Sequence, residues 1–461
     1  MTGLTETLAR FICEKSLRDL PEGAIEKAKK VIADTFAVML AGSGSELAAP
    51  LLRYADLSGE SGASPIFGAA QTCTPEIAAL LNGAFGHALD FDDVLSMMPA
   101  HPSAVILAAL CASLGSKSVS GARLIEAYAL GIEVGGKIGL GITVGHYHRG
   151  FHGTGTLGIF SALGALARLH RLESGTTRTA FGIASSMASG LQRNFGTMTK
   201  PLHTGWAARS ALAAVRLATC GVTAAPDVLE AKAGFFAAYG GEQSDPMVTA
   251  ASLGKPWILT DPGIALKKFP CCYASHRGMD GVLELKRRHT FTAGDVEQLT
   301  CLMPPGGMRA LIYARPVTGL QGKFSLEYAL AAGLLDGKYD LWTFTDKAVQ
   351  RPAIAAAMDR IRVKEDPRCT EGDPLFERRS PGSRGFVEVE AVLKNGIRDA
   401  VRIGEPPGHP SRELTWDDIH SKFMDCTAYA HLPEDRARRA FDLIHTLETL
   451  DDVTEMLALL R

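Results

Sequence analysis

The chain has 461 residues, of which 46% are hydrophobic and 21% charged, so it is long enough for about three domains and has the composition of a folded protein rather than a disordered one. Its 48 lysines and arginines nearly balance 50 acidic residues, so we expect no nucleic-acid partner, and any anion site must be local. The longest apolar run, 104–113, is too short to cross a bilayer, and the start of the sequence lacks the pattern of a signal peptide. Nine scattered cysteines without a C-x-x-C pair are typical of reduced thiols, so we expect a cytoplasmic protein with no membrane partner.

The first 265 residues predict packed helices. A helix is expected to begin near Pro21, which suits a first helical turn. No proline occurs between Pro102 and Pro201, and glycine and alanine are frequent enough there to let helices approach closely. Apolar residues recur at helical spacing on almost every face, as in helices buried inside a large domain, in segments 104–114, 121–140, 154–170 and 207–219.

The pattern changes after about residue 265. Strand-like runs at 386–393 and 397–403 flank Asn395-Gly396, which is typical of a tight hairpin, and 296–303 also alternates like a strand. Helical patterns return after Leu414, with Thr415 and Pro433 near helix starts. We therefore predict a multidomain fold of the α plus α+β class. A large all-helical domain (1–265 together with 410–461) would receive a smaller α+β domain (266–409) before its C-terminal helices.

The first polar group in the helical part runs from His87 to Asp93 and continues at His101. It contains three carboxylates within four residues, Asp90, Asp92 and Asp93. They fit a metal site, an acid–base group or the cap of the following helix, although their spacing matches no standard zinc pattern. The Asp-x-Asp-Asp pattern also occurs in terpene cyclases, but those need more aromatic side chains than the 7% present here.

A second polar group surrounds His152. His146, Tyr147, His148 and Arg149 precede it in what reads as a loop before a helix of small residues. A position just before a helix favours bound anions and a neutral imidazole. The alternatives are an ordinary surface loop or a His-x-His metal site, which would lack an obvious third ligand.

A third group surrounds Lys200 and His203. Pro201 should keep Lys200 out of a helix interior, so we expect the lysine on an extended turn that leads into a helix. If it points into an apolar domain, it can serve as a base, an acid or a carboxylate anchor. The alternative is a solvated lysine.

The predicted α+β domain offers fewer candidates. Lys268, Cys271, Cys272 and His276 lie in a junction segment, where the adjacent cysteines resemble a catalytic nucleophile only superficially. Ser325 is a plausible helix N-cap for a helix at 325–335. Tyr328 in that helix would, by itself, be interpreted as a core residue.

Together, these segments resemble the MmgE/PrpD family over nearly the whole chain. The resemblance implies a large all-helical domain plus a smaller α+β domain, in a homodimer, with a cleft between the domains. Its motifs are His-Ala-Leu-Asp-Phe-Asp-Asp (87–93), His-Pro-Ser (101–103), Phe-His-Gly-Thr (151–154), Gly-Thr-Met-Thr-Lys-Pro-Leu-His-Thr-Gly (196–205), Lys-Phe-Pro-Cys-Cys (268–272) and Lys-Phe-Ser-Leu-Glu-Tyr (323–328).

Family activities include 2-methylcitrate dehydratase, cis-aconitate decarboxylase and iminodisuccinate epimerase. The family's decarboxylases and dehydratases commonly have threonine after the Asp-Asp pair, where this chain has Val94 followed by an apolar loop. The resemblance therefore favours an isomerase of the epimerase branch acting on an iminodisuccinate-like acid. A carbon–oxygen or carbon–carbon lyase, either a 2-methylcitrate-type dehydratase or a cis-aconitate-type decarboxylase, is the alternative.

The chemistry shared by these activities makes or breaks a bond at a carbon next to a carboxylate, and fixed cations must stabilise the charge that develops. An epimerase needs a proton-exchanging group on each face of that carbon. No nucleotide or flavin motif is present, so we expect no cofactor, no metal, and a small carboxylic acid as the partner. The expected catalytic residues are Asp90, His101, Tyr147, His152, Lys200 and Tyr328, and the expected substrate-binding residues are Arg149, His203, Lys268 and His276.

Overall fold

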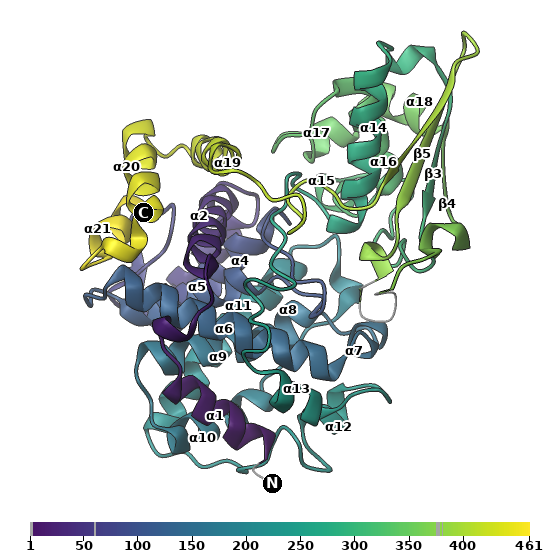
Figure 1. Ribbon diagram of the computed structural model, residues 1–461. Coiled ribbons are helices and arrows are strands. Elements are labelled where there is room, and N and C mark those ends of the chain that lie inside the picture. The colour runs from purple at the N-terminus through teal and green to yellow at the C-terminus, as the bar shows by residue number, and fades with distance from the viewer. Residues whose placement is uncertain (1–2, 60, 375–378, 380) are drawn as a thin grey trace. The chain divides into compact units, whose positions relative to one another are not determined.

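The computed structural model describes residues 3–59, 61–374, 379 and 381–461. The chain forms two compact units (Figure 1). The helical unit comprises Met1–Arg193, Thr199–Leu266 and Leu414–Arg461, and the α+β unit comprises Asn194–Met198 and Lys267–Glu413. The sequence placed the α+β domain at 266–409 but gave no sign that Asn194–Met198 would pack with it.

The helical unit is built around α4, α5, α6, α9 and α11, with α11 packed on α4 and α6 on α9. The expected α class is confirmed, apart from a short β1–β2 hairpin (Ser64–Pro65 and Thr72–Cys73) that the sequence did not predict. The helices of this unit are α1 (Leu4–Glu14), α2 (Ala24–Ser43), α3 (Ala48–Ser58), α4 (Pro75–Ala88), α5 (Pro102–Leu114), α6 (Gly121–Ile142), α7 (Gly145–His148), α8 (Gly153–Thr156), α9 (Gly158–Leu169), α10 (Ser174–Ser185), α11 (Thr199–Thr219), α12 (Phe235–Tyr239), α13 (Pro246–Ser252), α19 (Trp416–Tyr429), α20 (Glu434–His445) and α21 (Thr454–Leu459).

Two glycines allow α4 and α11 to touch at backbone distance. A Cβ atom added to Gly83 would lie 2.8 Å from the Cα atom of Gly205, and one added to Gly205 would lie 2.1 Å from the carbonyl oxygen of Leu80. Any side chain at either position would therefore push the helices apart. This close approach brings the first turn of α11 next to the last turn of α4.

Two helix predictions differ from the structure. The segment expected as one helix at 154–170 is divided into α8 and α9 at Leu157. The expectation of an extended turn at Lys200 is wrong, because α11 begins at Thr199 and includes Lys200 and Pro201 in its first turn. Proline fits there because the first N–H groups of a helix have no intrahelical acceptor.

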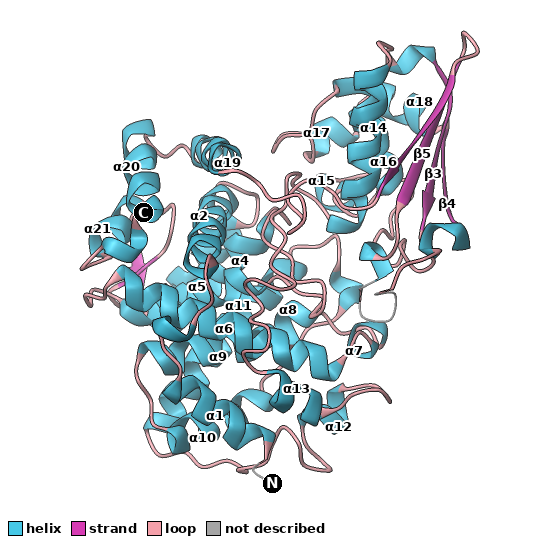
Figure 2. Cartoon of the chain, viewed as in Figure 1, coloured by secondary structure: helices cyan, strands magenta, loops and turns pink. Residues whose placement is uncertain are grey.

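The α+β unit contains a four-stranded sheet in the order β4-β3-β5-β6, shown in magenta in Figure 2. β3 (Val296–Met303) pairs in parallel with β4 (Ile361–Glu365) and antiparallel with β5 (Val387–Leu393), which pairs antiparallel with β6 (Arg398–Ile403). Helices α14 and α16 pack against the sheet. The helices of this unit are α14 (His276–Arg288), α15 (Gly319–Gly322), α16 (Leu326–Asp336), α17 (Asp346–Val349) and α18 (Pro352–Met358).

The hairpin prediction is confirmed in this unit. β5 buries every second side chain, and its pairing with β6 includes Val389 opposite Val401. The turn between them contains Gly396 at φ 87°, a left-handed conformation that glycine adopts without strain. The N-cap prediction is also confirmed, because the Ser325 hydroxyl accepts from the backbone N–H of Tyr328 at 3.1 Å.

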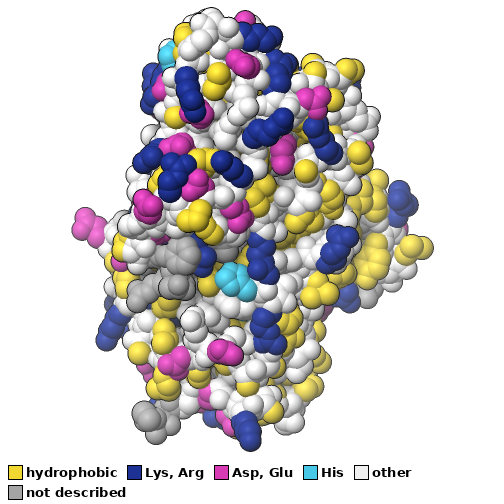
Figure 3. Space-filling view, turned by 90° about the vertical axis from the view of Figure 1, so that its right-hand side faces the viewer, with side chains coloured by type: hydrophobic (Ala, Val, Ile, Leu, Met, Phe, Trp, Pro, Cys, Tyr) yellow, Lys and Arg dark blue, Asp and Glu magenta, His cyan; other side chains and the backbone are white. Residues whose placement is uncertain are grey.

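Among the described residues, no single helix is both long and apolar enough to cross a membrane. α2 and α3 would meet that test only as a pair, and they are bent by 84° relative to each other. On the face of the molecule in Figure 3, lysine and arginine side chains are spread among acidic and hydrophobic ones. This distribution suits the near-neutral net charge of the chain.

Candidate active site

The candidate site is built on the short loop that follows α4. His87 lies in the last turn of α4, and the loop then carries Asp90, Asp92 and Asp93. All four side chains are buried. Asp90 has φ 51°, a left-handed conformation that residues other than glycine rarely adopt. Buried charged groups are costly unless they are partnered, so their partners define the site.

Lys200 joins two of these side chains. Its ammonium nitrogen lies 2.8 Å from His87 Nε2 and 3.1 Å from Asp90 Oδ1. On its other side, His87 Nδ1 lies 2.8 Å from Asp92 Oδ2. A carboxylate at Nδ1 fixes the tautomer that carries the proton there, which leaves Nε2 as the acceptor for the Lys200 ammonium. The result is a buried chain from Asp92 through His87 to Lys200.

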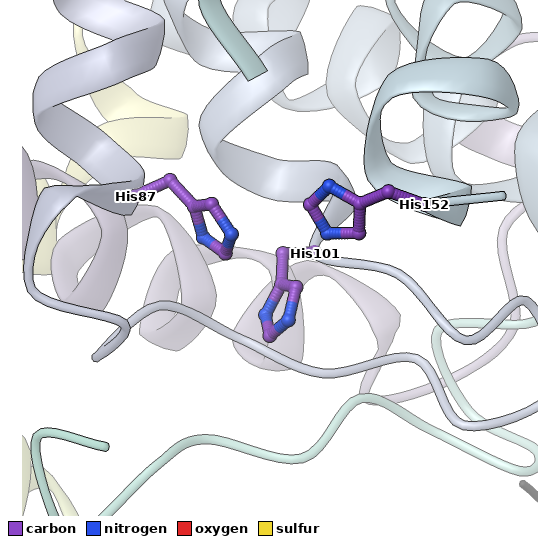
Figure 4. A group of neighbouring side chains, drawn as sticks. All are labelled: His87, His101 and His152. Atoms are coloured by element: carbon purple, nitrogen blue, oxygen red, sulfur yellow. The ribbon is translucent and has the colours of Figure 1, made fainter. Parts of the chain in front are cut away.

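Two more imidazoles face this chain, as Figure 4 shows for His87, His101 and His152. The His87 ring centroid lies 4.5 Å from that of His101 and 5.6 Å from that of His152. His101 Nδ1 lies 2.6 Å from the carbonyl oxygen of Asp93, and His152 Nδ1 lies 3.0 Å from His203 Nδ1. The structure thus brings together four of the five residues that the resemblance implied, Asp90, His101, His152 and Lys200, and adds His203; the fifth, Tyr328, lies in the α+β unit.

The paired imidazoles of His152 and His203 are held neutral. Burial first, and then the positive charge of Lys200 and the neighbouring histidines, lowers the pKa of His152 well below its usual 6.5. Burial, and then the positive charge of Lys200, lower the pKa of His203 to about 4. One Nδ1 atom of the pair donates and the other accepts, so each ring carries one proton and can exchange it at neutral pH without already being charged.

Asp93 belongs to a separate buried chain. Its Oδ2 atom accepts from the Ser103 hydroxyl at 2.6 Å, and that hydroxyl lies 2.7 Å from the Tyr128 hydroxyl. Burial and the nearby charge of Asp92 raise the pKa of Asp93 to about 8. Asp93 is therefore protonated at neutral pH and supports the loop, while its backbone carbonyl orients His101.

The same side chains could hold a metal ion by distance alone. Potential ligand atoms of His87, His101 and His152 lie within 4.8 Å of one another, as do those of His87, Asp90, Asp92 and His101. Both sets include His87, whose Nε2 atom already lies against the Lys200 ammonium. Since a cation there would have to displace another cation, this donor set fits a metal poorly.

Two expected residues near His152 lie on the loop around α7. The Arg149 guanidinium donates to the backbone carbonyls of Ala238 and Gly240, so it supports the chain itself. Tyr147 is half-buried on α7, where its carbonyl accepts from Gln192. The catalytic role expected of Tyr147 and the substrate-binding role expected of Arg149 stay predictions.

Three expected residues lie in the α+β unit. Tyr328 is fully buried in its core, and its hydroxyl donates to the backbone carbonyl of Thr343. This placement favours the core interpretation of Tyr328 over a role as proton donor, because its proton is already committed. His276 is buried with Nε2 3.3 Å from the carbonyl oxygen of Cys271, whereas Lys268 is exposed. The expected cleft between the domains stays a prediction.

Comparison with known proteins covers both units. Residues 6–247 match the MmgE/PrpD N-terminal domain, and residues 269–449 match the MmgE/PrpD C-terminal domain. The chain belongs to the MmgE/PrpD family. It is 26% identical to the cis-aconitate decarboxylase of Mus musculus, with all of this chain and 94% of the relative covered. The enzymes of Homo sapiens and Aspergillus terreus with the same name are also 26% identical, with all of this chain and 95% and 96% of the relative covered.

These MmgE/PrpD relatives correct one expectation from the sequence. The relatives just described carry the name of a decarboxylase, a lyase, so the comparisons do not support the expected resemblance to iminodisuccinate epimerase. They support the alternative better, although at low identity.

Within this MmgE/PrpD chain, sequence reasoning missed the roles of His87, Asp92, Ser103 and Tyr128. His87 and Asp92 lie in the motif 87–93, but nothing in the sequence shows that they form a chain with Lys200. A carboxylate five residues after a histidine at a helix end is the available signal. Tyr128 lies inside an apolar helix and gives no signal at all.

Proposed function

We propose that the protein is a lyase that decarboxylates a small di- or tricarboxylic acid resembling cis-aconitate. The observation that carries the proposal is the buried chain Asp92–His87–Lys200, which presents an ammonium group beside two further imidazoles. The decarboxylase names of full-length relatives support the same chemistry. The expected homodimer stays a prediction.

Decarboxylation breaks the bond between a carbon and its carboxyl group. The electron pair of that bond stays on the substrate and spreads toward a conjugated carboxylate, while carbon dioxide leaves. A proton must then reach the carbon skeleton. Fixed cations that face the remaining carboxylates lower the energy of the charged intermediate, and a positioned acid completes the reaction.

Lys200 suits both tasks. Asp90 Oδ1 and His87 Nε2 both accept from its Nζ atom, so the side chain is presented as a charged ammonium group. It can anchor a carboxylate and donate a proton to the developing carbanion. Since Asp92 fixes the His87 tautomer, the lone pair of Nε2 keeps the ammonium oriented while the reaction proceeds.

His101 and His152 complete the acid–base set. His152 is neutral, so it can donate a hydrogen bond to a carboxylate or receive a proton from the substrate. His101 is partly exposed, and its Nδ1 atom lies against the Asp93 carbonyl, which fixes the orientation of the ring. Together they supply groups other than Lys200 for proton exchange.

Epimerisation is a second candidate, favoured by the loop after Asp93. Val94 and Leu95 are buried and apolar. Val94 therefore places a hydrocarbon side chain where the threonine common in the family's decarboxylases and dehydratases would offer a hydroxyl to a tricarboxylate. Proton removal and return without bond loss would use the same histidines and lysine. The two candidates differ only in the fate of the carbon–carbon bond.

The test is a panel of acids with the purified protein in deuterated water, followed by proton NMR. The panel contains cis-aconitate, citrate, 2-methylcitrate and iminodisuccinate. We expect one acid to lose a carboxyl group and to gain deuterium in the product. Deuterium exchange into an acid that keeps all its carboxyl groups would replace decarboxylation by epimerisation, and no reaction with any carboxylic acid would contradict both.

A further inference from the structure

The loop that carries the catalytic carboxylates needs a restraint from outside itself. Asp90 and Asp92 contact Lys200 and His87, and Phe91 lies between them. Asp90 is held at φ 51°, which an aspartate seldom adopts without support from its surroundings. Because Phe91 is covalently joined to both aspartates, a displacement of its backbone would move both carboxylates.

Lys422 on α19 contacts Phe91 in two ways. Its Nζ atom donates to the carbonyl oxygen of Phe91 at 2.9 Å, and it also lies 3.7 Å from the centroid of the Phe91 ring. A carbonyl hydrogen bond and a cation–π contact from one ammonium fix both the peptide plane and the side chain. The two residues are 331 positions apart in the sequence.

A buried acid holds Lys422 in place. Asp34 Oδ1 on α2 lies 2.6 Å from the ammonium nitrogen, and α19 packs on α2. Asp34 is fully buried and Lys422 nearly so, so each charge requires the other. The charge of Asp34 also reaches the loop, since it contributes to the raised pKa of Asp93.

We propose that Lys422, anchored by Asp34, is a positioning residue that fixes the Phe91 peptide and thereby aims Asp90 and Asp92 at Lys200 and His87. The inference rests on the proposed function for its kinetic consequence. It assigns to the C-terminal helices a part in the active site, because α19 joins the helical unit only after the chain has passed through the α+β unit.

A purely structural ion pair is the competing explanation, and the same unit contains one for comparison. Lys137 is buried, lies 3.7 Å from Glu133 Oε1, and donates to the carbonyl oxygen of Pro256 at 2.7 Å. It has the same charge, burial and type of acceptor as Lys422. Its acceptor lies outside the loop 89–93, whereas Lys422 binds the Phe91 carbonyl inside the loop and also lies over the Phe91 ring. Glu133 additionally accepts from the backbone N–H groups of Gly254 and Ile258.

The experiment compares two matched double variants, Lys422→Met with Asp34→Asn and Lys137→Met with Glu133→Gln. Each removes both charges of a buried pair while keeping similar volumes, which proteins often tolerate. We expect both to fold, as shown by circular dichroism and melting temperature. The Lys422 variant should lose at least ~10-fold in kcat with a smaller change in KM, because a small misplacement of reacting groups is costly. The Lys137 variant should stay within about twofold of wild type.

Hydrogen exchange gives a readout that does not depend on the reaction. The amides of residues 89–95 should exchange faster in the Lys422 variant and at the wild-type rate in the Lys137 variant. Lys422→Arg, which keeps a cation, should recover part of both properties. Unchanged kcat and unchanged exchange in the Lys422 variant, or equal losses in both double variants, would overturn the inference. If wild type converts no carboxylic acid, the proposed function fails while hydrogen exchange still decides the role of Lys422.

Discussion

The Nζ atom of Lys200 lies 2.8 Å from Nε2 of His87, although 113 positions separate the two residues in the sequence. The contact exists because α11 touches α4 at Gly205 and Gly83, where no side chain intervenes. With Asp92 behind His87 and Asp90 beside Lys200, a single helix contact thus assembles a proton-exchanging group inside an apolar domain.

Lys200→Met should keep the fold and lower kcat by at least ~10²-fold, in line with the usual contribution of a positioned acid–base group. Methionine preserves much of the side-chain volume but removes the ammonium that binds His87 and Asp90. Steady-state kinetics with the acid identified in the panel provides the measurement, with circular dichroism as the folding control. Nearly normal turnover in a folded variant would remove Lys200 from the mechanism.

Gly205→Ala should weaken both stability and activity. Its Cβ atom would lie 2.1 Å from the carbonyl oxygen of Leu80, so α11 must move away from α4, at a cost of about 1–3 kcal/mol. Gly175→Ala is the matched control, because nothing lies within 4 Å of its added Cβ atom near the start of α10. Thermal melting should show a lower midpoint for the first variant and an equal or higher one for the second. Equal midpoints would show that α4 and α11 do not need this close contact.

Asp93 should make the protein less stable as the pH rises from about 4 to about 8. Its pKa is about 8 in the folded state against an ordinary value of 3.8, so the folded state holds a proton that the unfolded state has lost. The stability that this proton supplies is complete below pH 4 and is lost as the pH rises, by up to about 1.4 kcal/mol per pH unit.

Asp93→Asn isolates this effect. The amide can still accept from the backbone N–H of Ser103 and can donate to the Ser103 hydroxyl, so the variant should fold. The difference in melting temperature between wild type and the variant should shift steadily in favour of the variant from pH 5 to pH 8. Histidines with low pKa values, such as His146 and His203 at about 4, oppose this trend by weakening both proteins as the pH falls below 6.5. A difference that does not change with pH would contradict a protonated Asp93.

Dialysis against a strong chelator should leave the activity intact. The two sets of side chains close enough to hold a metal share His87, and Lys200 occupies its Nε2 atom. Activity should be measured before and after dialysis, and again after adding back single divalent ions. Loss of activity that one ion restores would mean that Lys200 moves aside and that the histidines and carboxylates bind a metal.

Local patterns predicted much of the fold. The apolar helix α5, the hairpin of β5 and β6, and the Ser325 cap depend on neighbouring residues, so the sequence reveals them. β4 was missed because its pattern is mostly charged and because it pairs with β3, from which it is distant in sequence. The position of Lys200 was missed because the rule that proline ends a helix does not apply in a first turn.

In the candidate site, too, the sequence revealed what motifs contain and missed what long-range packing creates. Asp90, His101, His152 and Lys200 were expected together because their motifs resemble those of a family, and the structure brings them together. The partners of these residues depend on long-range packing that no motif contains, as with Lys422 and Phe91. For function, the prediction of an epimerase depended on one residue, Val94, where the family's decarboxylases and dehydratases commonly have threonine. The relatives, which match this chain over its whole length, favour the lyase alternative.

The most direct test of the central claim follows carbon-13 in cis-aconitate labelled in all its carboxyl groups, with the protein in deuterated water. Decarboxylation predicts one labelled carbon dioxide or bicarbonate for each product molecule, and a product that carries one new deuterium. Lys200→Met should slow both signals together by the same factor. Retention of all labelled carboxyl groups, with deuterium appearing in recovered substrate, would contradict the account.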